Sequence, residues 1–145
     1  MKELTASIAI TGTRQGMTAQ QKRSLISFFK FLKTLEITIT EAHHGDCVGS
    51  DSEFHDLIKD RGFPIIIHPP KNPKYRAFRS GNKSCPEKEY LDRNRDIVHA
   101  CDILIAIPKT DKEEQRSGTW ATVRYAKREN KLVIIINPNG GTVCL

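Results

Sequence analysis

The chain alternates between short apolar runs and longer segments in which apolar residues recur every three or four positions. Runs of five to eight apolar or alternating residues, bounded by turn residues, are typical of β-strands, and continuous ones are typical of buried parallel strands. Five strands are therefore predicted. They are "ASIAITGT" (6–13), "EITIT" (36–40), "PIIIH" (64–68), "DILIAIP" (102–108) and "KLVIIINP" (131–138).

Helices are predicted in the segments between these strands. The first has a stripe of apolar residues from Leu25 to Leu35 at helical spacing. A Ser or Thr followed three residues later by Glu or Gln is a capping box, the signature of a helix start. The four predicted helices begin at Thr18-x-x-Gln21, Ser50-x-x-Glu53, Ser84-x-x-Glu87 and Thr119, and the last three end near Arg61, Ala100 and Asn130.

This alternation of strands and helices predicts an α/β fold. Strands separated by helices form a parallel sheet with helices on both faces, so we expect a Rossmann-like doubly wound sheet of about five strands. The expected strand order is 3-2-1-4-5. The length of 145 residues, without an internal repeat or linker, indicates a single domain over 1–145.

Glycine and hydroxyl residues follow several of the predicted strands. In a doubly wound sheet, ligands bind beyond the carboxyl ends of the strands, near the point where strand order reverses. Three triplets fall there: Gly12-Thr13-Arg14, Gly49-Ser50-Asp51 and Ser117-Gly118-Thr119. The last two lie at predicted helix starts, where free amides and the helix dipole favour anions. Helix capping alone also explains such triplets singly.

The common cofactor motifs are absent. "TGTRQG" is neither G-x-G-x-x-G nor the Walker A pattern, so a dinucleotide dehydrogenase and a P-loop NTPase are both excluded and no cofactor is expected. Asn94 lies on the helical stripe of Leu91, Ile97 and Val98, which is expected to face the sheet. A buried amide needs partners, so Asn94 either makes a structural hydrogen bond or lies, with Arg93 or Arg95, at the floor of a pocket.

The histidines of "EAHHGDCVGSDSEFHD" (41–56) do not predict a metal site. The spacing of His43, His44, Cys47 and His55 matches none of the common zinc signatures. Adjacent strand residues also point to opposite faces, so His43 and His44 are not expected to bind one ion. A pocket-lining histidine, or one that packs or caps, is the expected role.

Composition indicates a globular protein with one strongly basic segment. Apolar residues make up 38% and charged residues 28%, and no apolar run is long enough to span a membrane. The four cysteines form no CxxC pair, which favours reduced thiols and a cytoplasmic location, and the first residues indicate a strand and not a signal peptide. Of the net charge of +6, five charges fall within 69–84. Such a run is either a solvated loop or a site for a phosphate-bearing partner.

As an ordered series, these motifs resemble the SLOG superfamily. The series is "GTR", "HHGDCVGSD", "HPP", "RNRDIV" and "SGTWATVRYAKRENKLVIIINPNG", and it spans nearly the whole chain. The small stand-alone SLOG proteins of bacteria and phages are the most similar branch, with LONELY GUY hydrolases and DNA-processing protein A as relatives. The resemblance implies a nucleotide-type ligand bound by Gly12, Thr13, Arg14, His44, Gly45, Gly49, Asp51, Arg93, Asn94, Ser117, Gly118 and Thr119.

The chain departs from the hydrolase branch of this superfamily. LONELY GUY enzymes have P-G-G-x-G-T-x-x-E, whereas "RSGTWAT" has Arg116 and Ser117 at the two glycines and Thr122 at the glutamate. Cleavage of a glycosidic bond generally needs a carboxylate. The remaining candidates for acid or base chemistry are Asp46, Asp51 and His44.

Three functions are compatible with the sequence. The first is binding, as a sensor or sequestering protein, of a nucleotide or nucleotide-derived ligand. The second is hydrolysis of an N-glycosidic bond. The third is binding of single-stranded nucleic acid, because Tyr75 and Phe78 alternate with Arg76 and Arg79. Trp120 and Tyr125 either pack in the core or face a partner subunit in a homo-oligomer.

Overall fold

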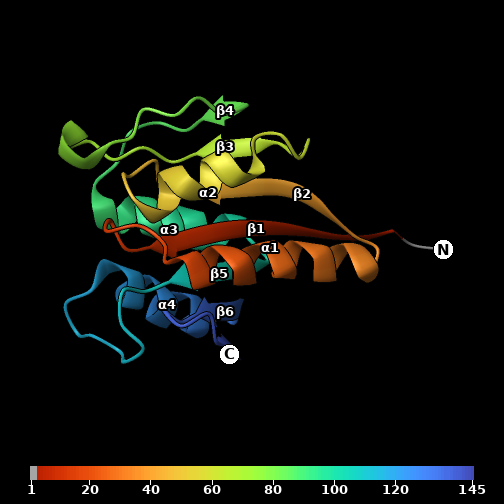
Figure 1. Cartoon of the computed structure of the whole chain (residues 1–145). Coiled ribbons are helices and arrows are strands. Elements are labelled where there is room, and N and C mark those ends of the chain that lie inside the picture. The colour runs from red at the N-terminus through yellow and green to blue at the C-terminus, as the bar shows by residue number, and fades with distance from the viewer. Residues whose placement is uncertain (1–2) are drawn as a thin grey trace.

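The computed structural model describes residues 3–145, which form one sheet with helices on both faces (Figure 1). The strands are β1 (Leu4–Gly12), β2 (Ile37–His44), β3 (Ile65–Ile67), β4 (Lys83–Ser84), β5 (Ile103–Ile107), β6 (Leu132–Ile136) and β7 (Thr142–Cys144). The α-helices are α1 (Ala19–Thr34), α2 (Ser50–Ile58), α3 (Tyr90–Ala100) and α4 (Gly118–Arg128), and a 3₁₀ turn spans Pro73–Tyr75.

The strand order is β4-β3-β2-β1-β5-β6-β7, and every neighbouring pair is parallel except β6 and β7. The five predicted strands correspond to β1, β2, β3, β5 and β6, and their predicted order is confirmed. The two edge strands are additional. β4 consists of two exposed residues and β7 of three, too few for a hydrophobic pattern to show.

Two apolar layers hold the helices against the sheet. On one face, Leu25 and Phe29 of α1 and Phe54 of α2 pack against the even-numbered isoleucines of β1. On the other face, the apolar residues of α3 and α4 pack against alternate residues of β5 and β6. In Figure 1, α1 and α2 lie in front of the sheet and α3 and α4 lie behind it. The predicted doubly wound architecture is therefore present.

Two predicted helix starts are wrong. Gly49, and not Ser50, precedes the first residue of α2, with a φ of 93° that favours glycine. The Ser50 hydroxyl donates instead to the Thr13 carbonyl at 2.8 Å. Ser84 belongs to β4, and α3 begins six residues later at Tyr90. The capping box of Thr18 and Gln21 is confirmed, with the Gln21 amide 3.0 Å from the Thr18 hydroxyl.

The side chains of α3 and α4 also correct the predicted stripes. Ile97 and Val98 are buried as predicted, but Leu91 is 59% exposed because the helix begins only one residue before it. Trp120 is buried in the core, and Tyr125 packs partly buried beside it with its hydroxyl 2.6 Å from His99 Nε2. Both aromatics are therefore used in packing within the chain. No helix in residues 3–145 is long and apolar enough to cross a membrane.

Candidate functional site

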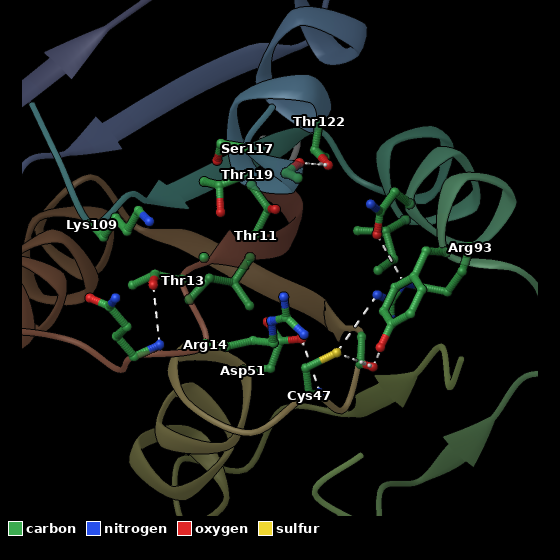
Figure 2. Close-up of a pocket in the computed structure, with 18 of the residues that line it drawn as sticks. Thr11, Thr13, Arg14, Cys47, Asp51, Arg93, Lys109, Ser117, Thr119 and Thr122 are labelled. Carbon is green, nitrogen blue, oxygen red and sulfur yellow. Dashed lines mark hydrogen bonds between the residues drawn. The ribbon is translucent and has the colours of Figure 1, made fainter. Parts of the chain in front are cut away.

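A pocket of about 590 Å³ lies at the carboxyl ends of β1 and β5. The chain after β1 leads to β2 on one side, whereas β5 lies on the other, so strand order reverses at this point. Figure 2 shows the pocket between the start of α4, the loops after β1 and β2, and α3. Its wall therefore comes from four separate segments of the chain, as the fold predicts for a ligand site.

Most of the residues predicted for the ligand site line this one pocket. They are Gly12, Thr13, Arg14, Gly45, Asp51, Arg93, Asn94, Ser117, Gly118 and Thr119. Four other candidates do not line it: His44, Asp46, Gly49 and Ser50. The pocket also contains residues that were not expected as ligand contacts, namely Thr11, Cys47, Tyr90, Lys109 and Arg116. Tyr90 was not considered because the predicted start of α3 was six residues too early. Lys109 follows β5 after one residue, so its position at the carboxyl end of the strand was a signal for ligand contact.

The start of α4 is suited to hold an anion. Ser117 caps the helix, and its hydroxyl accepts from the Trp120 amide at 3.3 Å. The first amides of a helix have no partner inside it, so those of Gly118 and Thr119 are available at the pocket wall. A Cβ on Gly118 would meet no atom of residues 3–145 within 4 Å. This glycine leaves space in the pocket and not in the core.

The start of α2, predicted as a second anion site, packs against the loop after β1. The Ser50 amide and hydroxyl both donate to the Thr13 carbonyl, at 3.0 and 2.8 Å. Gly49 packs directly against the backbone of Arg14, and a Cβ on Gly12 would overlap the Ser50 side chain. These glycines allow α2 to approach β1 closely. The amide and hydroxyl of Ser50 are therefore occupied by the protein itself.

Asp51 is the one catalytic candidate that reaches the pocket. Its side chain is buried, and Oδ2 accepts from the Cys47 amide at 3.2 Å. Burial raises the pKa of this carboxyl to about 6, although the nearby Arg93 cation and the hydrogen bond from Cys47 lower it. A carboxyl group with such a pKa can exchange a proton near neutral pH.

Arg93 forms the floor of the pocket and is itself buried. One nitrogen donates to the carbonyls of Gly45 and His68, and Nε donates to Asn94 Oδ1 at 2.9 Å. Another nitrogen lies 3.7 Å from the Cys47 sulfur, as the dashed line in Figure 2 shows. The Asn94 oxygen therefore has a structural partner, and the residue also lines the pocket.

The last two residues of β2, His43 and His44, each belong to a buried histidine pair. His44 Nε2 lies 3.0 Å from His55 Nδ1, and His44 Nδ1 accepts from the Asp46 amide. His43 points the other way, to His68 at 2.8 Å. Burial lowers the pKa of His44 to about 3 and that of His68 to about 4. His44 therefore supports the pocket loop from below. Residues 3–145 contain no group of three metal-binding side chains close enough to hold an ion.

The basic loop 69–84 is tied to the protein by ion pairs. Arg76 Nε lies 2.9 Å from the fully buried Asp46, and a second nitrogen lies 3.1 Å from Glu87. The Arg79 amide also donates to Asp46, and its guanidinium pairs with Asp56. Asp46 is thus committed to holding this loop. Towards the pocket, the Arg14 guanidinium lies over a ring of the same loop, 3.9 Å from the centre of Tyr75.

Comparison with known proteins supports the fold. No family model matches the chain, and no curated protein matches its sequence. The chain is similar to the X-ray structure of TM1055, a Northeast Structural Genomics Consortium target, with a TM-score of 0.66 over 93% of this chain and 76% of that one. The two sequences are 12% identical, so the likeness extends to the fold alone. The chain has a Rossmann-like α/β fold with a pocket at its strand-order reversal.

Proposed function

We propose that this chain is a SLOG-type protein that binds a nucleotide or nucleotide-derived ligand in the pocket between β1, α3 and α4, as a sensor or a sequestering protein. The main support is the convergence of the free amides of Gly118 and Thr119 with Arg14, Lys109 and Arg116 on one pocket at the strand-order reversal. Amides at a helix start and nearby cations are the usual partners of a phosphate group.

The shape of the pocket supports a ligand larger than a free phosphate ion. Its volume of about 590 Å³ lies within the range of sites that hold small organic ligands. Polar groups line opposite sides of it, with Ser117 and Thr119 at the start of α4 and Asp51 and Arg93 across the pocket. Asn94 also lines the pocket, next to Arg93. A phosphate at α4 would leave the hydroxyl groups of a sugar within reach of the carboxylate and amide.

The test is ligand identification followed by a pocket-blocking variant. Small molecules carried through purification are identified by mass spectrometry, and nucleotides, ADP-ribose and cyclic nucleotides are screened by thermal unfolding. A ligand should raise the Tm by several degrees, because it binds only the folded chain. Gly118→Val should abolish the shift, since its methyl groups would enter the pocket without touching the core.

Ala19→Val is the matched control for this variant. Ala19 is likewise the first residue of its helix, α1, and is exposed outside the pocket. It should leave the ligand-induced shift unchanged. If no phosphate-bearing ligand raises the Tm, or if Gly118→Val responds like the unmodified protein, the proposal is wrong.

Hydrolysis of an N-glycosidic bond is a second candidate, and Asp51 is the observation that favours it. A buried carboxyl with a pKa of about 6 beside a sugar-sized cavity could activate water or protonate a leaving base. Thr122, where LONELY GUY enzymes have glutamate, donates to the Gly118 carbonyl at 2.9 Å and offers no charge. Incubation with nucleoside monophosphates should release free base, and Asp51→Asn should stop the release. Absence of free base after long incubation would exclude this activity.

A further inference from the structure

We infer that the ligand carries two linked phosphate groups, and that Lys109 and Arg116 select it over a ligand with one. This inference rests on the proposed function, because it concerns the composition of the ligand in the same pocket. It follows from the distribution of charge along the pocket wall and from the way each cation is held.

The two ends of the pocket differ in their charge balance. At the α3 end, the Arg93 cation is close to the Asp51 carboxyl, and each lowers the net charge that the other presents. The α4 end has the cations Lys109 and Arg116 and the carboxylate of Glu114. Because Arg14 lies between the two ends, the pocket wall as a whole has four cations and two carboxylates. Figure 2 shows Lys109 and Arg93 on opposite sides of the pocket, with Arg14 and the start of α4 between them.

Within residues 3–145, Arg14, Lys109 and Arg116 have no carboxylate partner. Every ion pair within residues 3–145 lies elsewhere, so none of these side chains is neutralised by an ion-pair contact. Glu114 itself accepts a hydrogen bond from the Thr110 hydroxyl at 2.9 Å. The basic loop is the contrast, because Arg76 and Arg79 there are both paired with acids.

One phosphate group does not use all of this positive charge. A phosphate monoester carries about −1.5 to −2 at neutral pH, and its oxygens can be bound by the amides and hydroxyls at the start of α4. Four cations against two carboxylates along the pocket wall, with about half a charge more from the helix dipole, leave a surplus of positive charge. A second phosphate linked to the first would neutralise this remaining positive charge.

Arg14 is positioned so that its donors remain free for the ligand. Its guanidinium stacks on the Tyr75 ring. Stacking occupies the face of the guanidinium and leaves the N–H groups along its edge available for oxygen atoms. Lys109 follows β5 after one proline, and Arg116 directly precedes the helix cap, so both are attached to ordered elements at the anion site.

The test compares ligands that differ by one phosphate. Titration calorimetry is performed in EDTA at about 0.15 M salt, where long-range attraction is screened. The probes are inorganic phosphate against pyrophosphate, and the monophosphate against the diphosphate of each ribonucleoside. We expect pyrophosphate, and the diphosphate of any nucleoside that binds, to bind about tenfold more tightly than its partner.

Two variants assign this preference to residues. Lys109→Ala with Arg116→Ala should weaken the binding of both ligands, but that of the diphosphate more, so that the preference falls to about twofold. Lys112→Ala is the matched control, because it removes a cation from the same loop outside the pocket. It should keep the full preference, and the Tm of each variant verifies folding.

The outcomes separate this inference from the proposed function. If monophosphates and diphosphates bind equally well, the inference is overturned while nucleotide binding stands. If Lys112→Ala reduces the preference as much as the pocket variants, net charge and not the pocket explains it, and the inference is again overturned. If none of the probes binds, both proposals fail.

Discussion

Arg93 is a buried cation whose guanidinium is used mainly by the protein's own backbone, through the carbonyls of Gly45 and His68. Arg93→Ala would leave both carbonyls without this donor and the buried Asp51 without its nearby cation. Such losses inside a protein cost about 3 kcal/mol in the free energy of unfolding. Urea denaturation should show this loss, and Arg93→Lys should recover less than half because an ammonium cannot reproduce the planar fork.

Arg95→Ala is the control for Arg93 on the same helix. Arg95 is exposed and stacks on Tyr125 with its guanidinium 5.2 Å from the ring centre. The Arg95→Ala substitution should lower the free energy of unfolding by less than about 1 kcal/mol. Equal losses for Arg93→Ala and Arg95→Ala would contradict the buried hydrogen-bonding role.

Asp51 should make the protein less stable as the pH rises. Its pKa in the folded chain is about 6, above the ordinary 3.8, so the folded state holds the proton more tightly. The stabilising contribution is present at low pH and is lost as the pH rises through the window between these values. Asp51→Asn lacks this loss, so its stability relative to the unmodified protein should rise between pH 4 and pH 7 by up to about 3 kcal/mol.

The measurement is a pair of urea denaturation series across this pH range. Histidine contributions are common to both proteins and cancel in the difference. A difference that stays constant with pH would show that the Asp51 carboxyl titrates as it does in the unfolded chain.

At the scale of elements, local periodicity is sufficient to predict most of the sheet and the first helix start. The five long strands, their order and the capping box of α1 are all visible in the pattern of apolar and polar positions. The start of α2 is not, because Ser50 fits a capping box as well as it fits its real role against Thr13. That role depends on a tertiary contact between β1 and α2, which no window of the sequence contains.

The candidate site was predictable for a related reason. Gly12, Arg14 and Ser117 follow strands or precede a helix, and the fold rule brings such positions to one edge. His44 and Asp46 satisfy the same rule but turn inward, towards His55 and Arg76. The direction in which a side chain leaves a loop depends on partners from distant segments. Sequence order alone therefore does not distinguish the residues that line the pocket from those that support its loops.

The two histidine pairs should make the folded chain sensitive to acid. His44 and His68 have pKa values of about 3 and 4 when folded, below the ordinary 6.5. Below pH 6.5 the unfolded chain gains protons that the folded chain cannot accept, so stability falls as the pH drops. Each histidine lowers the free energy of unfolding by up to about 1.4 kcal/mol for each pH unit below 6.5. Asp51 has the opposite pH dependence, but a single carboxyl offsets the effect of only one histidine.

His68→Gln should make the free energy of unfolding depend less steeply on pH, by the contribution of one histidine. Glutamine can still hydrogen-bond His43 but does not titrate. His99→Gln, at an exposed position, is the control that should keep the slope. The free energy of unfolding, measured by urea between pH 4 and pH 7, gives both slopes. An unchanged slope in His68→Gln would contradict the assignment.

At the scale of the whole molecule, the basic loop contributes five charges to the net charge of +6. Nearby carboxylates partly neutralise these charges. Arg76, Arg79 and Lys71 each have a carboxylate partner within 4 Å, so the loop is folded onto the protein. Arg76→Ala should lower the free energy of unfolding by about 3 kcal/mol, because the Asp46 side chain has no exposed surface and would lose its cation. Arg79→Ala should cost less than about 1 kcal/mol of unfolding free energy, since both side chains of its pair are partly exposed.

This contrast decides how binding of single-stranded nucleic acid can be tested. A loss of oligonucleotide binding in Arg76→Ala would report the loop coming away from Asp46, and not a lost phosphate contact. Lys74 and Lys83 have no acidic partner among residues 3–145, so Lys74→Ala with Lys83→Ala removes charge without breaking an ion pair. If the loop binds single strands, this double variant should weaken binding and reduce its salt dependence while the Tm stays unchanged. Binding that survives the double variant would place any nucleic-acid contact outside the loop.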